Sequence, residues 1–333
     1  PRRTTAWRAT LYLGLASMVL LAALLMIGTQ AGFTFSGLKD FMASGRELAH
    51  AELIGALLIA GFGTLISLFP FHSWAAPAYA SAPAPVAMMH AGVLKKFGLY
   101  GLFMFQPLME TGFLPWTNIL LVLLVCNVIW VGYVTVNQKR LDLLLGNSSV
   151  MHMGYIFLAF AALVVSGSAE ANPWALKGAA LLMLAHGLTI ALLFLLCGQI
   201  EKQTGTLEIN SLGGLSTRLP RMAFVFGLAG MASIGLPGLA NFPGEFMVFF
   251  SGFAGFSNGF GPVQIATILC LWGLVIGAVY MLRAYRNIFQ GDLSKASAYA
   301  TGLQPSERAA NCFLVIALAV FGFFPTLVLQ FFS

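Results

Sequence analysis

Apolar residues fill nine long stretches of the chain, and short segments rich in polar residues, proline or glycine separate them. A helix needs about 20 largely apolar residues to cross a bilayer. Since each stretch reaches about that length, the pattern predicts an all-α, polytopic membrane protein with about nine transmembrane helices. We place these helices at residues 9–28, 52–71, 84–106, 115–137, 146–167, 174–199, 222–256, 263–283 and 309–331.

The seventh stretch differs from the others because helix-breaking residues lie in its middle. It spans 35 residues, more than one straight crossing needs, and contains Gly235-Leu236-Pro237-Gly238 followed by Pro243-Gly244-Glu245. An interruption at membrane depth is tolerated only where protein or a hydrated cavity satisfies the freed backbone groups. The sequence therefore predicts at least one helix that is broken near the midplane of the membrane.

The composition agrees with a lipid environment and excludes a water-soluble domain. Hydrophobic residues make up 59% of the 333 residues and charged residues only 8%, whereas a soluble domain carries about 25% charged residues. The net charge of +6 comes from scattered lysines and arginines without a basic run, so it does not indicate a nucleic-acid partner. The four cysteines are single and far apart, which indicates neither disulfides nor a metal site.

The sequence lacks the motifs of the common cofactor sites. It contains no glycine-rich dinucleotide motif, phosphate-binding loop, HExxH metal motif or cysteine cluster for an iron–sulfur centre. We therefore expect no cofactor, no metal and no redox active site in this chain. Because the chain begins with Pro1, we expect its start to be processed or incomplete.

Basic residues outside the nine stretches gather on one side of the predicted membrane protein. With alternating crossings, twelve of them share the side of the N-terminus, and Lys39 and Arg46 lie on the other side. By the positive-inside rule the N-terminus is cytoplasmic, or faces the matrix or stroma of an organelle, and the C-terminus lies outside. We favour a bacterial inner membrane. The twelve are Arg2, Arg3, Arg8, Lys139, Arg140, Lys202, Arg218, Arg221, Arg283, Arg286, Lys295 and Arg308.

Three titratable residues lie inside the apolar stretches at a similar depth. Lys96 falls in the middle of the third stretch, His186 in the middle of the sixth, and Glu245 just after the break of the seventh. A charge at the bilayer centre costs roughly 2.5 to 3.5 kcal/mol on insertion scales, so such residues normally face the bundle interior and mark an ion or proton path. We predict that these three residues carry protons; a static buried ion pair is the alternative.

Three further residues are weaker candidates for the same path. His90 lies six residues before Lys96, about 9 Å along a regular helix and some 120° around it, so the two are not expected on one face. Lys95 points about 100° away from Lys96; it contacts a neighbouring subunit, or the two lysines share one proton because like charges oppose each other. His152, near the start of the fifth stretch, either passes protons inward or serves packing.

Several short motifs occur in an order that resembles the antiporter-like membrane subunits of respiratory complex I, in particular subunit M (chain 4), and the related Mrp-type antiporter subunits. The resemblance covers most of the chain from about residue 50, and the order and spacing of the motifs are specific. The motifs are Pro70-Phe71-His72-Ser73-Trp74, Ala91-Gly92-Val93-Leu94-Lys95-Lys96-Phe97-Gly98, Ser148-Ser149-Val150-Met151-His152-Met153-Gly154, Ala185-His186-Gly187 and Asn241-Phe242-Pro243-Gly244-Glu245-Phe246.

The resemblance implies a fold in which two inverted five-helix repeats each contain one broken helix, as in many transporters. Residues 1–106 are then the remainder of the first repeat, residues 107–288 the second repeat, and residues 289–333 a loop and the last helix. The first broken helix is the second stretch, interrupted near Pro70. An upstream segment or a separate chain is the expected source of the missing N-terminal helices.

The resemblance further implies a proton-translocating membrane-arm subunit of an NADH–quinone oxidoreductase. The complex as a whole is then the enzyme, and partner subunits of its membrane arm and beyond hold NADH, flavin, iron–sulfur clusters and quinone. Lys96 matches the family's central lysine, His186 its central histidine and Glu245 the terminal glutamate of the half-channel. His72 matches the histidine of the first broken helix and joins the weaker candidates.

The first half of the chain departs from the family pattern. Leu65 stands where the family carries a lysine, seven residues before His72, and Pro77, Tyr79 and Ser81 replace the usual Asp, His and Glu. Alternatives within the family are a subunit of a multisubunit cation/proton antiporter, of a membrane-bound hydrogenase or of an inorganic-carbon uptake complex. Alternatives of other classes are a secondary carrier for a small solute and a structural membrane subunit with a degenerate channel, for which Leu65 is the best evidence.

Overall fold

The computed structural model describes residues 2–254 and 259–332, and the regular secondary structure of this part of the chain is all helical, without a strand. Residues 255 and 256 of the seventh predicted stretch, and the two terminal residues, lie outside the described residues. The helices are α1 (Arg2–Ala31), α2 (Phe35–Ala43), α3 (Ala51–Ile66), α4 (Ala75–Ser81), α5 (Ala84–Met89), α6 (Lys95–Met104), α7 (Thr117–Val136), α8 (Leu141–Ser166), α9 (Pro173–Thr204), α10 (Pro220–Ser233), α11 (Asn241–Ser251), α12 (Pro262–Phe289), α13 (Pro305–Phe323) and α14 (Thr326–Leu329).

Six segments are long and apolar enough to cross a membrane: α1, residues 106–136 ending in α7, α8, α9, α12 and α13. The protein is therefore an integral, multi-pass membrane protein, as predicted. The other three predicted stretches are each divided. Residues 52–71 hold α3 and a loop, residues 84–106 hold α5, a π turn and α6, and residues 222–256 hold α10 and α11. The count of about nine crossings stays a prediction.

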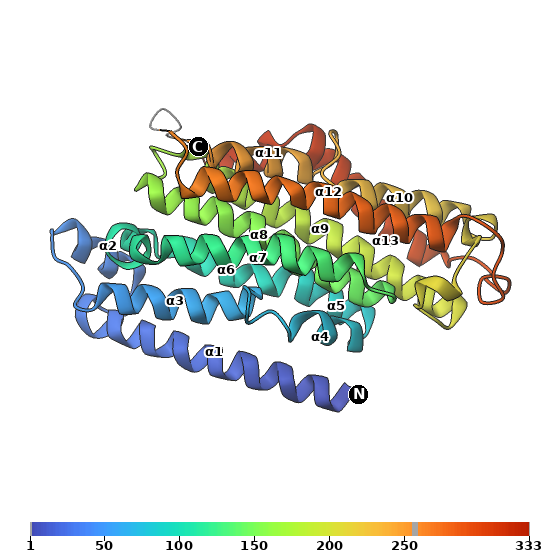
Figure 1. Cartoon of the computed structure of the whole chain (residues 1–333), viewed down its shortest axis with the longest axis horizontal. Coiled ribbons are helices and arrows are strands. Elements are labelled where there is room, and N and C mark those ends of the chain that lie inside the picture. Colours follow the sequence, from blue (N-terminus) through green and yellow to red (C-terminus); the bar gives the residue numbers. More distant parts are fainter. Residues whose placement is uncertain (1, 255–258, 333) are drawn as a thin grey trace.

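The long helices lie side by side along the longest axis of the molecule, with α1 at one edge of the bundle (Figure 1). Helix α8 is buried along nearly its whole length, because it packs against α4, α7, α9, α11 and α12. Helices α1 and α13 instead expose large apolar side chains such as Leu15 and Phe313. The site described below is therefore built around α8, at the centre of the bundle.

The second predicted stretch is interrupted, and a side chain of α7 satisfies the interruption. Helix α3 ends at Ile66, and Ser67 adopts a left-handed conformation with a φ of 72°. The Nδ2 atom of Asn127 donates to the carbonyl oxygens of Ser67 and Val150, both at 3.1 Å. Its Oδ1 atom accepts from the backbone N–H of Phe69 at 2.5 Å. Asn127 thus supplies the partners that a broken helix needs at membrane depth.

The break predicted in the seventh stretch is confirmed. Helix α10 ends at Ser233 and α11 begins at Asn241. Between them Gly235 and Gly238 have φ values of 79° and 92°, a region that glycine adopts readily. The carbonyl oxygen of Ser233 is hydrogen-bonded to Nε2 of His152 at 2.9 Å. A side chain of a neighbouring helix therefore satisfies the second break, as Asn127 satisfies the first.

A π-helical turn at His90–Leu94 divides the third stretch and joins α5 to α6. A π turn holds more residues than the 3.6 of an α-helical turn, and each extra residue rotates the following helix by about 100°. The expectation that His90 and Lys96 lie on different faces assumed a regular helix, so the π turn removes that argument. The contacts nevertheless separate the two residues, because His90 packs on Trp74 and Tyr79 whereas Lys96 lines a groove that His90 does not line.

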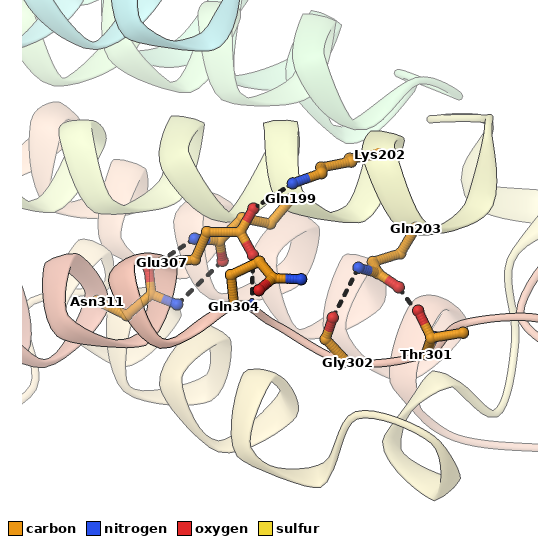
Figure 2. Close-up of polar contacts among 8 residues, drawn as sticks. All are labelled: Gln199, Lys202, Gln203, Thr301, Gly302, Gln304, Glu307 and Asn311. Carbon is orange, nitrogen blue, oxygen red and sulfur yellow. Dashed lines mark hydrogen bonds and ion pairs between the residues drawn. The ribbon is translucent and has the colours of Figure 1, made fainter.

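The start of α13 is held to the end of α9 by polar side chains (Figure 2). Gln199 and Asn311 are buried and exchange two amide hydrogen bonds, at 3.1 and 2.9 Å. Nearer the surface, Nζ of Lys202 donates to Oε1 of Glu307 at 2.8 Å. Because much of α13 is exposed, these contacts determine where it docks on the bundle.

Replacing one member of the amide pair is expected to destabilise the protein more than replacing both. In Gln199→Leu or Asn311→Leu the remaining buried amide loses its partner, which costs about 1–3 kcal/mol. In the double variant two leucines face each other, and the cost is close to zero. Thermal unfolding in one detergent measures the difference. Lys202→Ala is the control, because exposed ion pairs contribute only about 0–1 kcal/mol; equal losses in the single and double variants contradict this account.

Candidate functional site

Lys95 lies where α4, α6 and α8 meet. It begins α6, and its side chain is fully buried. Its Nζ atom donates to the carbonyl oxygen of Ser149 on α8 at 3.3 Å and lies 3.5 Å from the Ser149 hydroxyl. It also lies 5.7 Å from the ring centre of Tyr79 on α4, a cation–π distance. Lys95 is thus enclosed by this chain, and its expected contact with a neighbouring subunit is wrong.

Ser149 connects Lys95 to His186. Its hydroxyl oxygen is hydrogen-bonded to Nε2 of His186, on α9, at 3.2 Å. His186 is buried, and its Nδ1 atom has no hydrogen-bond partner among the described residues. A serine hydroxyl both donates and accepts, and a neutral histidine has one donor and one acceptor nitrogen. The pair can therefore pass a proton while both side chains stay in place.

His152 stacks on His186 and reaches the second helix break. The two ring centres are 5.1 Å apart and the rings are inclined by 21°. Nδ1 of His152 lies 2.7 Å from the carbonyl oxygen of Ser148, and Nε2 lies 2.9 Å from that of Ser233. Both carbonyls only accept, and only a protonated ring donates from both nitrogens. A proton on His152 therefore satisfies both carbonyls, whereas the neutral ring satisfies one.

Glu245 is buried on α11, directly after the same break. Gly235 lies against its Oε2 atom, where any side chain would overlap the carboxyl group. Its Oε1 atom is buried without a hydrogen-bond partner among the described residues. His152 and Glu245 thus contact the break at Ser233 and Gly235, two residues apart. Lys95, Ser149, His186 and His152 thus form a line of buried polar groups, and the carboxyl group of Glu245 lies at its end.

A static ion pair does not account for these buried charges. The ion pairs of the described residues are Arg140–Asp142 and Lys202–Glu307, and both lie at helix ends. Neither buried lysine is paired with Glu245. The alternative interpretation of the lysine and the glutamate, a structural salt bridge, therefore finds no support in the described part of the chain.

Lys96 does not share the hydrogen bonds of Lys95. Its Nζ atom donates to the carbonyl oxygen of Ala91, in the π turn of its own helix. Lys96 lines an apolar groove of about 730 Å³ between α5, α6 and α9, together with residues such as Phe97. The two lysines thus face different sides, as their spacing predicts. The hydrogen bonds, however, join Lys95 rather than Lys96 to His186.

His90 and His72 contact aromatic rings rather than the polar groups around Lys95. The ring of His90 lies 5.5 Å from Trp74 and 5.4 Å from Tyr79, the ring that Lys95 also contacts, whereas His72 stacks on Phe69 at 5.3 Å. Nδ1 of each histidine is buried without a partner among the described residues. Neither histidine therefore belongs to the polar groups that connect Lys95 to the second break.

The position of Leu65 remains apolar in the fold, close to Gly98 of α6. The hydroxyl of the preceding Thr64 donates to the carbonyl oxygen of Ala60 at 2.8 Å, within its own helix. Lys95 and Lys96 are the buried lysines of the described residues. The first broken helix, with the segment that follows it, therefore contributes aromatic rings and His72, but no lysine of its own.

Ser149 is a site residue that our sequence reasoning missed. It lies three residues before His152 on α8, and residues at this spacing share one helix face. This spacing was the available signal, but a serine inside an apolar stretch is not distinctive by itself. Its importance depends on Lys95, which approaches from another helix.

The start of α8 carries an ion pair of the kind that is common at helix ends near the protein surface. At the start of α8, Arg140 and Asp142 form an ion pair at 2.7 Å, and this hydrogen bond raises the pKa of Arg140.

A polar cavity of about 600 Å³ lies near α2, lined by Lys39, Arg46 and Glu110 among others. The described residues contain no group of three His, Cys, Asp or Glu side chains that could hold a metal ion.

Comparison with known proteins places the chain among membrane subunits of large complexes. A family model described as NADH:quinone oxidoreductase/Mrp antiporter, TM, matches residues 2–269. NAD(P)H-quinone oxidoreductase chain 4 1 of Synechococcus elongatus is 36% identical over 339 residues, which cover 99% of this chain and 60% of that protein. NAD(P)H-quinone oxidoreductase chain 4 2 of Microcystis aeruginosa is 34% identical, over 94% of this chain and 55% of that protein.

Solved structures of two kinds of complex contain a similar fold. A chain of respiratory complex I from Thermus thermophilus with bound NADH has a TM-score of 0.87 and 25% identity, over 99% of this chain and 67% of that chain. A chain of the Mrp complex from Dietzia sp. has a TM-score of 0.82 at 18% identity, over 99% of this chain and 66% of that chain, and shows the fold alone. The present chain spans about 60% of the length of the first of these relatives.

Proposed function

Because this chain belongs to the NADH:quinone oxidoreductase/Mrp antiporter transmembrane family, we propose that it is a proton-translocating membrane-arm subunit of an NADH–quinone oxidoreductase complex. NADH, flavin, iron–sulfur clusters and quinone bind to partner subunits, and this chain moves protons. The observation that carries the proposal is the buried polar line that runs from Lys95 through Ser149, His186 and His152 to the break beside Glu245.

The proposed topology has about nine crossings, because each divided stretch crosses the membrane as an interrupted helix. Residues 1–106 belong to the first inverted repeat, residues 107–288 to the second, and residues 289–333 form a loop and the last crossing. The two helix breaks support this division, because such repeats each carry one discontinuous helix. The N-terminus is cytoplasmic, the C-terminus lies outside a bacterial inner membrane, and an upstream segment or a separate chain completes the first repeat.

The lysine pair holds the proton at one end of the path. Lys95 and Lys96 are adjacent and buried, and like charges oppose each other, so the pair carries one proton at a time. Lys96 faces the groove, and Lys95 contacts Ser149. The shared proton therefore moves from Lys96 to Lys95, and from there through the Ser149 hydroxyl to His186.

The two histidines carry the proton to the second break. Histidine takes up and releases protons near neutral pH, and internal water completes the steps between His186, His152 and Glu245. A positive charge on the lysine pair favours the ionised form of Glu245 through their mutual attraction. Loading a proton at the lysine end therefore promotes its release at the glutamate end, outward or to the next subunit.

Proton transport by the purified complex in liposomes tests the proposed function. We expect the wild-type complex to transport protons during NADH oxidation and quinone reduction. His186→Gln should assemble but lose pumping by at least about a hundredfold, the lower end of the effect of proton-transfer groups. His50→Asn is the matched control, because His50 is exposed and has a φ of 58°, which asparagine tolerates. Undiminished pumping by assembled His186→Gln contradicts the proposal.

The neighbours of this chain in its complex decide between related functions. A multisubunit cation/proton antiporter, a membrane-bound hydrogenase and an inorganic-carbon uptake complex use subunits of similar design. Mass spectrometry of the intact complex identifies the partners and shows which chain supplies the remaining helices of the first repeat. Subunits that bind NADH and flavin are the expected partners, and cation-antiporter subunits in their place contradict the assignment to an oxidoreductase.

One observation favours a second candidate, a structural membrane subunit that does not pump. Leu65 occupies the position of the lysine of the first broken helix and lies in apolar surroundings. If the first half-channel is required, the loss of this lysine disables the path. The liposome experiment separates the two candidates, because a structural subunit leaves pumping unchanged when His186 is replaced.

A further inference from the structure

Tyr155 spans the space between His152 and the helix that carries Glu245. It lies on α8, three residues after His152, and is fully buried. Its ring meets the ring of His152 edge to face, with centres 5.6 Å apart, and that of Phe249 at 5.2 Å. Phe249 follows Glu245 by four residues on α11, which is about one helical turn. Tyr155 therefore links the surroundings of the histidine to those of the carboxyl group.

The hydroxyl of Tyr155 is buried and has no hydrogen-bond partner among the described residues. It lies directly against Gly273 of α12, where any side chain would overlap it. An unpaired buried hydroxyl costs about 1–3 kcal/mol, whereas phenylalanine would keep both ring contacts without that cost. A hydroxyl kept in such a place indicates a role beyond packing.

Groups that donate and accept protons lie near Tyr155. Glu245 lies one turn before Phe249 on the helix that Tyr155 contacts, and Oε1 of Glu245 is likewise buried without a partner among the described residues. The hydroxyl of Tyr280 is hydrogen-bonded to the Ser148 hydroxyl at 2.7 Å, and the Ser148 carbonyl is hydrogen-bonded to His152 at 2.7 Å. Hydroxyl groups of α8 and α12 therefore lie beside His152, about one helical turn from Tyr155.

We propose that the Tyr155 hydroxyl transfers the proton between His152 and Glu245, an inference that rests on the proposed proton path. The phenol oxygen accepts a proton that leaves His152 through internal water. Its own O–H bond breaks at the same time, and that proton passes to an internal water, which releases one of its own protons to form a new O–H bond at Oε1 of Glu245. The phenol is restored by the proton it accepts, so Tyr155 never ionises and no electron donor or acceptor is needed.

Tyr155→Phe in the complete complex tests this transfer. The variant should assemble with unchanged or higher thermal stability, because the removed hydroxyl has no protein partner among the described residues. Protons pumped per electron transferred should fall by at least about a hundredfold. Tyr133→Phe is the matched control, since the ring of Tyr133 on α7 is 63% exposed and lies away from the path; it should pump as the wild type does.

The infrared carboxyl band of Glu245 gives a readout that a packing role would not change. The band is identified by its loss in Glu245→Gln, and it should move to higher frequency in Tyr155→Phe because the hydrogen bond that reaches the carboxyl group from the phenol through water is lost. If Tyr155→Phe does not assemble, p-fluorophenylalanine at position 155 fills the volume of the hydroxyl without a transferable proton and should also lose pumping.

Two outcomes separate this inference from the proposed function. Wild-type pumping by an assembled position-155 variant, while Glu245→Gln does not pump, overturns the role of Tyr155 and leaves the path in place. Wild-type pumping by assembled Glu245→Gln overturns the path itself, and the role of Tyr155 with it. An unchanged Glu245 band in a pumping-deficient Tyr155→Phe complex also contradicts transfer through Tyr155.

Discussion

Glu245→Gln is expected to abolish proton pumping, by about a hundredfold or more, while the complex still assembles. Glutamine has nearly the same shape as glutamate but cannot release a proton to the next acceptor. Glu245 is buried, forms no ion pair among the described residues and leaves Oε1 without a partner. Its replacement therefore breaks no ion pair and should not lower stability, and a loss of pumping reports on proton transfer. Acidification of liposomes during NADH oxidation measures it.

Two further variants give comparisons for the Glu245→Gln result. Glu201→Gln changes an exposed glutamate near the end of α9 and should leave pumping unchanged. Glu245→Asp keeps a carboxyl group but withdraws it from Gly235 by one methylene, so we expect partial pumping. An assembled Glu245→Gln complex that pumps normally shows that the carboxyl group is not part of the path.

Lys95→Met and Lys96→Met are each expected to reduce pumping by at least about a hundredfold. Methionine keeps the length and apolar contacts of the lysine stem but holds no proton. Lys95 makes the contact with Ser149, so Lys95→Met disconnects the lysine end from His186. Lys96 is the lysine on the groove side, so Lys96→Met removes the group that loads Lys95. Pumping and complex assembly are measured together in the same preparations.

Lys177→Met is the matched control for the lysine variants. Lys177 lies within the first turns of α9 and is half-buried there, where a lysine reaches the membrane surface by snorkelling. Since a buried charge is costly, Lys95→Met should not lower the thermal stability of the complex. Normal pumping by Lys96→Met together with lost pumping by Lys95→Met contradicts transfer between the two lysines, and restricts the path to Lys95.

The breaks of the helices could be predicted from the sequence, because glycine and proline act locally. Gly235, Pro237 and Gly238 predict the interruption between α10 and α11 at the place where the structure has it. The residues that satisfy the breaks could not be predicted in the same way. Asn127 and His152 reach them from helices distant in sequence, and only packing of the bundle brings these groups together.

Which of the two lysines contacts α8 could not be derived from the apolar pattern. Their spacing predicts that Lys95 and Lys96 face different sides, but the π turn at His90–Leu94 rotates α6 relative to α5, and nothing in the apolar pattern of the third stretch marks it. Lys96 was the main candidate because of its depth and the resemblance, and Lys95 was a weaker one, whereas in the structure Lys95 makes the contact with Ser149. A single extra residue in one turn thus decides which lysine is hydrogen-bonded to α8.

The hydroxyl groups are the members of the site that are hardest to identify from the sequence. Ser149 and Tyr155 lie in an apolar stretch, and both residue types are common at helix interfaces without any role in transport. Their positions matter because His186 and Phe249 approach them from α9 and α11. Charged residues inside a membrane helix are easily recognised in a sequence, whereas the neutral groups that lie between them can be identified only once the fold is known.

The number of protons pumped per electron transferred tests the central claim most directly, when it is measured for Lys95→Met, for Glu245→Gln and for the double variant. If one path joins the two residues, either replacement interrupts it completely, and the double variant is no worse than either single variant. The account predicts the same low ratio in all three complexes. Partial, additive losses in the single variants, or a wild-type ratio in any assembled variant, contradict a single proton path from Lys95 to Glu245.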